Sequence, residues 1–206
     1  NVMNKQREVI YTWRDKLLAG NSTGEELREV CHGVIEGLVM QTASGDSSTS
    51  AWDLATLSNQ YNYTFGATIN LEGLHLSGDT QKAAQTLFDK LKEDLELQIT
   101  QREKELGSEK FLEIVRFYLL QSIDHYWKDH LAVLDHLKEG IGLRGYSQKN
   151  PLHEYQKEAF EMFTGSMERM KSAALHVAFH IRVLSQAEID EIERNQREAQ
   201  AKKEKL

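Results

Sequence analysis

Two long, unbroken stretches of helical periodicity, at residues 109–139 and 151–184, constrain the fold most strongly. In the first, apolar residues recur at intervals of three or four positions, which is the spacing of one helix face; they are Leu112, Val115, Leu119, Ile123, Tyr126, Leu134 and Leu137. In the second, the spacing is close to a coiled-coil seam; its positions are Tyr155, Ala159, Met162, Ser166, Met170, Ala173, Val177, Ile181 and Leu184. The pattern predicts two long antiparallel helices.

The connection between these helices, residues 140–149, is predicted to be a glycine-rich loop. It ends at Asn150-Pro151, which is typical of a helix start because asparagine caps free amides and proline needs none. Ile141, Leu143 and Tyr146 are expected at its exposed tip, beside the positive charge of Arg144. Exposed apolar groups next to a cation indicate a contact with another polypeptide or a membrane-associated partner. The alternative is that Leu143 and Tyr146 fold back on the helix ends.

Three further helices are predicted in the first half of the chain. One spans 2–18, with Val9, Ile10, Trp13 and Leu17 as its apolar positions. A capping box at residues 22–25, in which Ser22 and Glu25 satisfy free amides, starts a second helix that runs to about Met40. The third begins at Thr80, with an apolar stripe of Ala83, Leu87, Leu91, Leu95 and Ile99.

Residues 42–79 have a different character. Residues 44–50 are small and polar, as in a loop, and a short helix is predicted around Trp52 to Leu57. Aromatic residues alternate over 59–65, which favours an extended segment. We therefore expect a small, separately packed, mostly helical module inserted into an all-α fold of long helices.

Composition and motifs argue against several functions. The net charge is −7, which is unusual for a protein whose main partner is a nucleic acid, and the single cysteine, Cys31, excludes an internal disulfide. No phosphate-binding loop of the GxxxxGK[ST] type is present. Residues 140–145 match the dinucleotide pattern GxGxxG, but the predicted helix before them stands where that motif requires a strand.

Histidines are the remaining candidates for a site. His176 and His180 are one helical turn apart, as in zinc proteases, but Val177 stands where that chemistry needs a glutamate. Helix-face histidines are the favoured interpretation. Three more, His125, His130 and His136, alternate with aspartates around the predicted helix. For these we expect contacts with solvent or hydrogen bonds between helices rather than a metal.

The sequence resembles the SecA family, the motor ATPases of bacterial preprotein translocation. The residues that carry the resemblance to its two-helix finger are WKDHL at 127–131, GIGLRGYSQKNP at 140–151, EY at 154–155 and FEMF at 160–163. The opening VMNKQR, at 2–7, is similar to the family's scaffold helix. The match is good over 1–40 and 108–184 and poor over 42–80. Gly142 and Asn150 depart from the common family residues.

The resemblance implies a domain organisation. Residues 1–41 would be the first part of the helical scaffold, 42–107 the helical wing domain, 108–184 the scaffold with its two-helix finger, and 185–206 a charged helical linker. Catalytic residues are not expected in this chain, nor is a cofactor. The chain's ends are typical of a fragment of a longer protein. ATP and magnesium would then belong to motor domains before it, and zinc to a tail after it.

The resemblance also implies partners and a location. In the family, the finger tip contacts unfolded preprotein and the SecYEG channel, and the finger restrains the protein's own ATPase domains. By position, Tyr146 and Arg144 match the family's contact residues, with Leu143 and Ile141 beside them. The protein would work in the bacterial cytoplasm, on the inner face of the inner membrane. The rival is a stand-alone helical adaptor that self-associates through the seam at 155–184.

Overall fold

A computed structural model describes residues 2–20, 23–43, 48–76, 79–143, 150–182 and 194–195. These residues form α-helices and one 3-10 helix, without a strand among them, which confirms the all-α prediction. The elements are α1 (Val2–Leu18), α2 (Gly24–Ala43), η1 (Thr49–Ala51), α3 (Leu54–Phe65), α4 (Thr80–Leu106), α5 (Ser108–Leu143) and α6 (Pro151–His180).

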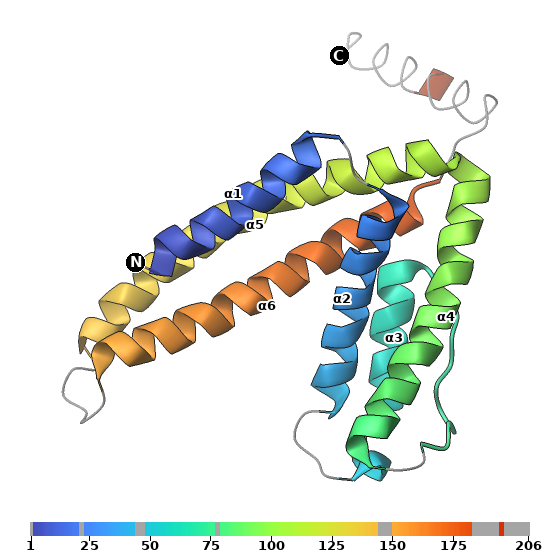
Figure 1. The fold of residues 1–206 in the computed structure, drawn as a ribbon, viewed down its shortest axis with the longest axis horizontal. Coiled ribbons are helices and arrows are strands. Elements are labelled where there is room, and N and C mark those ends of the chain that lie inside the picture. Colours follow the sequence, from blue (N-terminus) through green and yellow to red (C-terminus); the bar gives the residue numbers. More distant parts are fainter. Residues whose placement is uncertain are drawn as a thin grey trace, which may run out of the picture.

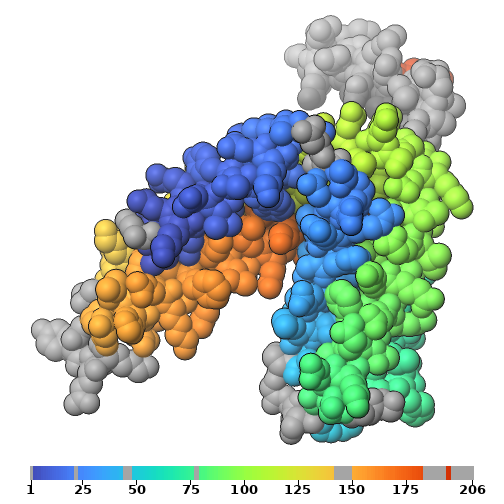
Figure 2. Space-filling view, viewed as in Figure 1, coloured from blue at the N-terminus to red at the C-terminus, as the bar shows by residue number. Residues whose placement is uncertain are grey.

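The helices form two arms that meet at an angle (Figure 1). Helices α1, α5 and α6 form one arm, and α2, α3 and α4 form the other. The space-filling view shows an open notch between α6 and the bundle that contains α2 (Figure 2). The C-terminal end of α5 and the N-terminal end of α6 therefore lie at the far end of one arm, and the junction of the two arms lies at the C-terminal end of α6.

The long arm contains the predicted antiparallel pair. Helix α5 has 36 residues and α6 has 30, so at about 1.5 Å per residue they extend for roughly 54 and 45 Å. Among the described helices, these two make the most extensive contact with each other, and α1 packs against both. The predicted apolar stripe on α5 is buried at five of its seven positions, Val115, Leu119, Ile123, Leu134 and Leu137. The other two, Leu112 and Tyr126, are partly buried against the core.

The second arm corrects the prediction for residues 59–65. They belong to α3, and the extended conformation is wrong because Tyr61 and Phe65, four residues apart, lie on one buried helix face. Tyr63, between them, is 66% exposed. The stripe on α4 is confirmed, since all five of its predicted residues are completely buried.

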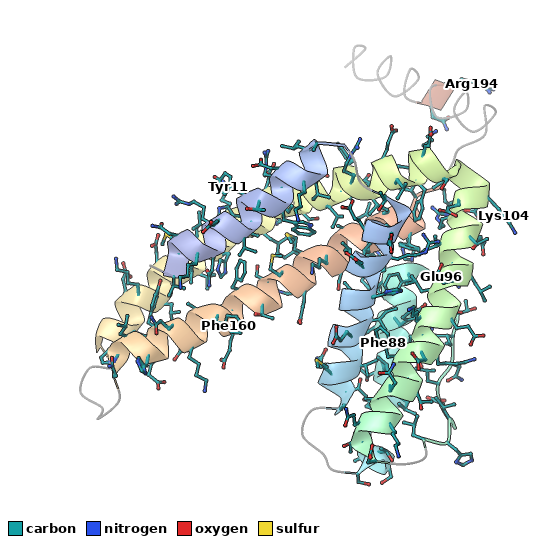
Figure 3. The ribbon with its side chains drawn as sticks, in the orientation of Figure 1. Tyr11, Phe88, Glu96, Lys104, Phe160 and Arg194 are labelled. Carbon is teal, nitrogen blue, oxygen red and sulfur yellow. The ribbon has the colours of Figure 1, made fainter. Side chains whose placement is uncertain are left out.

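Polar contacts tie the second arm together. Arg28 of α2 forms an ion pair with Glu96 of α4, with the Nε atom 2.9 Å from Oε2. The ring of His32 meets Phe88 of α4 edge-on, and Figure 3 shows Phe88 and Glu96 on α4. After α3, Ile69 exchanges both backbone hydrogen bonds with the side chain of Asn62. The segment that follows α3 is thereby held against it.

The described residues of the segment 42–79 do not form the separately packed module that we expected. One apolar core continues from Ile10 and Leu17 of α1, through the second arm, to the C-terminal end of α6. Phe179 of α6 lies between Phe65 of α3 and Phe111 of α5, with both pairs of ring centroids 5.3 Å apart. Helix α2, assigned to the scaffold with α1, packs mainly on α3 and α4.

The capping box of α2 lies one residue later than predicted. Thr23 Oγ1 accepts a hydrogen bond from the Glu26 amide at 3.2 Å, and the Thr23 amide donates to Glu26 Oε2 at 3.1 Å. The pattern was ambiguous because two glutamates follow two hydroxyl residues. The predicted partner Ser22 lies outside the described residues.

The seam on α6 also needs a correction at Met162 and beyond Met170. Ala159, Ser166 and Met170 are buried as predicted, but Met162 and Val177 are more than a third exposed. The buried residues near the C-terminal end are instead Ala174, Leu175, Ala178 and Phe179. This end of α6 contacts α3 and α2 as well as α5, so a wider face is covered than a two-helix seam requires.

Candidate functional site

The expected polypeptide-contact tip lies only partly within the described residues. Helix α5 continues to Leu143, so Gly140, Ile141 and Gly142 are helical and the predicted loop start at 140 is wrong. Arg144 and Tyr146 lie outside the described residues, and the side chain of Leu143 is not described. The structure therefore fixes the base of the tip and leaves its predicted contact residues untested.

Ile141 is not the exposed tip residue that we expected. Its side chain is only 6% exposed and lies in a small second core with Leu134, Leu137 and Ala159. Ile141 continues the apolar stripe, seven residues after Leu134, and burying its side chain contributes roughly 1.5–3 kcal/mol. Each helical glycine costs about 1 kcal/mol relative to alanine. The free energy gained by burying Ile141 therefore offsets the cost of Gly140 and Gly142, and α5 extends to Leu143.

On the other side of the link, α6 starts as predicted. Asn150 Oδ1 accepts a hydrogen bond from the Leu152 amide at 3.0 Å, and Pro151 occupies the first turn. Tyr155 packs against the second core together with Val2 and Met3 of α1. The start of α1 therefore supports the base of the tip.

A buried polar chain joins the three helices of this arm. Gln6 of α1 is 6% exposed and His130 of α5 is 4% exposed. The Gln6 amide nitrogen donates to the carbonyl oxygen of Ala159 in α6 at 2.9 Å, and Gln6 Oε1 lies 2.9 Å from His130 Nε2. A carbonyl only accepts, so the amide orientation is fixed and His130 must donate from Nε2.

The surroundings of His130 favour its neutral form. Burial lowers its pKa below the usual value, and the positive charge of Arg169 lowers it further. Trp127 and Phe163 lie against the imidazole, with ring centroids 5.7 and 5.5 Å away. The neutral ring therefore acts as a hydrogen-bond donor that positions α1, as expected for a histidine between helices.

The sequence interpretation missed Gln6. The residue is polar, so it was not counted in the apolar stripe of α1, although Met3, Gln6, Ile10, Trp13 and Leu17 recur at intervals of three and four. That spacing was the available signal. A glutamine on this face is buried because α1 packs on two helices at once.

Two further contacts hold α1 in place. Arg14 Nε donates to Asp124 Oδ1 of α5 at 3.0 Å, an exposed pair. The ammonium group of Lys171 in α6 lies 5.6 Å from the Trp13 ring centroid, a cation–π distance. Burial lowers the pKa of Lys171. Helix α1 is thus bound to both helices of the α5–α6 pair along its length.

The other candidate residues lie in separate surroundings. His125 and His136 are exposed beside Asp129 and Glu139 of their own helix. In the described part of the chain, no three metal-ligating side chains gather. The helical conformation of 140–143 removes the strand–turn–helix geometry that the dinucleotide pattern needs. Cys31 is completely buried, and burial raises its pKa.

None of the described helices combines the length and apolar character needed to cross a bilayer.

A family profile and individual proteins of known family both match this chain. A family profile described as "SecA Wing and Scaffold domain" matches residues 1–182. Proteins named "Protein translocase subunit SecA" are similar over nearly the whole chain. The protein of Syntrophobacter fumaroxidans is 37% identical over 95% of this chain. Those of Pelobacter propionicus and Alcanivorax borkumensis are each 36% identical, over 96% and 98%.

The match covers only part of each relative. The aligned region is 23% of the Syntrophobacter protein and 22% of the other two. It includes both arms of the structure and the α5–α6 pair. The chain therefore belongs to the SecA wing and scaffold domain family.

Proposed function

We propose that this chain is the scaffold, wing and finger region of a SecA-type motor, and that the tip of the α5–α6 pair contacts a preprotein during translocation. The observation that carries the proposal is the long α5–α6 hairpin, which α1 supports along one side and which packs on the second arm at the C-terminal end of α6. A rigid hairpin of this length can transmit a displacement from this junction with the second arm to its opposite end, the tip. Tyr146, Arg144 and Leu143 are the proposed contact residues.

Ile141 has a different role in this proposal. Because it is 6% exposed, it contributes packing at the base of the tip rather than a surface for the preprotein. The second core around it holds α5, α6 and the start of α1 together, next to the link. Movement of α1 is therefore expected to reach the tip through Val2, Met3 and the Gln6–His130 hydrogen bond.

The energy source lies outside this chain in the proposal. ATP and magnesium would be bound by motor domains elsewhere in the full-length protein, and zinc by a separate tail. This chain would supply no catalytic residue and would act on the motor domains through the scaffold. The partners would be unfolded preprotein and the SecYEG channel, at the cytoplasmic face of the bacterial inner membrane.

Cysteine crosslinking tests the tip role. A Tyr146→Cys variant of the full-length protein is combined with a preprotein stalled in the channel and carrying single cysteines. Cys31 should not compete, because it is completely buried and its thiol is held neutral. Crosslinks that require ATP and the channel are expected at position 146.

The matched control is Gln85→Cys, an exposed position on α4 in the other arm. It should give no ATP-dependent crosslink. Equal crosslinking at both positions, or none at position 146 in a translocating sample, would contradict the proposed tip contact.

The adaptor alternative makes a different prediction. It requires self-association through 155–184, yet Ala159, Ser166 and Met170 of that seam are buried within this chain. Of the exposed apolar side chains on α6, Phe160 is the most exposed and is the candidate to test for such a contact (Figure 3). Sedimentation equilibrium decides between them, since a dimer that Phe160→Ser dissociates would favour the adaptor.

A further inference from the structure

Two histidines lie side by side where the two arms meet. His176 and His180 are four residues apart at the C-terminal end of α6, and their ring centroids are 4.3 Å apart. The ring of His176 also stacks on Tyr63 of α3, whose ring lies nearly parallel to it at a centroid distance of 4.0 Å. The pair is therefore held by both arms.

The hydrogen bonds of the pair determine which nitrogen carries the proton. His176 Nδ1 lies 2.6 Å from the carbonyl oxygen of Tyr63, and His180 Nδ1 lies 2.7 Å from the carbonyl oxygen of His176. Carbonyl oxygens only accept, so both Nδ1 atoms donate. In the neutral rings, both Nε2 atoms then carry a free lone pair. This is the arrangement of metal-ligating histidines, whose second nitrogen donates to a carbonyl or carboxylate.

The backbone of α3 approaches the pair at Gly66, which ends that helix with a φ of +66°. A Cβ atom there would lie 3.6 Å from His180 Nε2, in van der Waals contact, so the glycine keeps this nitrogen clear of a side chain. The site is also at the C-terminal end of a helix, where unpaired carbonyl groups favour a cation. Arg102 donates to the carbonyl oxygen of Ile181 and offsets part of that effect.

We propose that His176 and His180 bind one divalent transition-metal ion through their Nε2 atoms, with water in the remaining positions. Imidazole pairs suit copper, nickel and zinc, whereas calcium and magnesium prefer oxygen ligands. Within the described residues no third histidine, cysteine or carboxylate joins the pair, so an open, water-completed site is expected. Bound metal would strengthen the junction of α6 with α3.

Calorimetric titration of the untagged 206-residue chain with Cu²⁺, the ion that nitrogen sites bind most tightly among these metals, tests the proposal. One tight equivalent is expected, with an electron paramagnetic resonance spectrum showing nitrogen ligands. His180→Gln should weaken this binding about tenfold or more, since one of two ligands is lost. His180 is exposed, so the variant should keep its helical circular dichroism.

The matched control is His125→Gln on α5, which removes an exposed histidine that also has a potential ligand, Asp129, one turn away. Tight binding should be unchanged there. The proposal is overturned if tight Cu²⁺ binding persists in each of the single variants His176→Gln and His180→Gln. It is also overturned if tight binding disappears in the His125→Gln control. Nitrogen-15 spectra give an independent test, because the Nε2-protonated tautomer at His176 and His180 in the metal-free chain would also overturn it.

Discussion

Replacement of Gln6 by leucine tests how α1 is held on the α5–α6 pair. The two side chains have similar volume, so packing is largely kept while both hydrogen bonds of the buried amide are lost. The carbonyl group of Ala159 keeps the intrahelical hydrogen bond expected within α6. The Nε2–H group of His130 keeps no partner in a site that is 4% exposed.

The expected cost follows from that unsatisfied donor. Leaving a buried N–H without a partner costs about 1–3 kcal/mol, and the added apolar burial of leucine returns roughly 1 kcal/mol. Gln6→Leu should therefore lower the free energy of unfolding by about 0–2 kcal/mol. Adding His130→Phe removes the orphaned donor and keeps an aromatic ring beside Trp127 and Phe163. The double variant should then be less destabilised than the sum of the two single variants.

Urea denaturation followed by circular dichroism, at about pH 8 where histidine is neutral, measures the effect. The midpoint should fall without a change in the slope of the transition. An exposed glutamine on α6, replaced in Gln156→Leu, is the control and should stay within about 0.5 kcal/mol of the parent. If the Gln6 and His130 effects are additive within about 0.5 kcal/mol, the hydrogen bond does not couple the helices.

Four further outcomes are expected. Burial holds the folded-state pKa of His130 below its usual 6.5, so the unfolded chain binds more protons than the folded chain near that pH. The stability that His130 contributes should be full above pH 6.5 and should fall as the pH drops below 6.5. Urea midpoints measured over a pH series should show this dependence in the parent and lose it in His130→Phe. Ile141→Ala should cost about 2–5 kcal/mol in unfolding free energy, whereas an exposed loop residue would cost little. On α4, Leu95→Ala should cost a similar amount, but Leu97→Ala, at a 66% exposed position, should change the urea midpoint little. Thr23→Ala should cost about 1 kcal/mol in thermal unfolding through loss of the α2 cap.

Local signals in the sequence were sufficient for most of the helices. The stripe from Ala83 to Ile99 predicted α4, because burial on one side of a helix repeats every three or four residues whatever the partner is. Asn150 and Pro151 predicted the start of α6, because a cap acts on amides of the same chain segment. The candidate site was harder to predict, since Ile141 was assigned to a loop on the evidence of its glycine neighbours.

What the sequence by itself determined was the five long helices, the antiparallel pair and the resemblance that the family match confirmed; the C-terminal half of α3 was predicted wrongly. Tertiary structure alone decided which groups share a site. Gln6 is buried because α1 lies on two helices, and Ile141 is buried because the second core extends to the end of α5. Likewise, Tyr63 orders His176 only because α3 packs against α6. Such contacts join residues 100 or more positions apart, and periodicity within one helix contains no information about its neighbours.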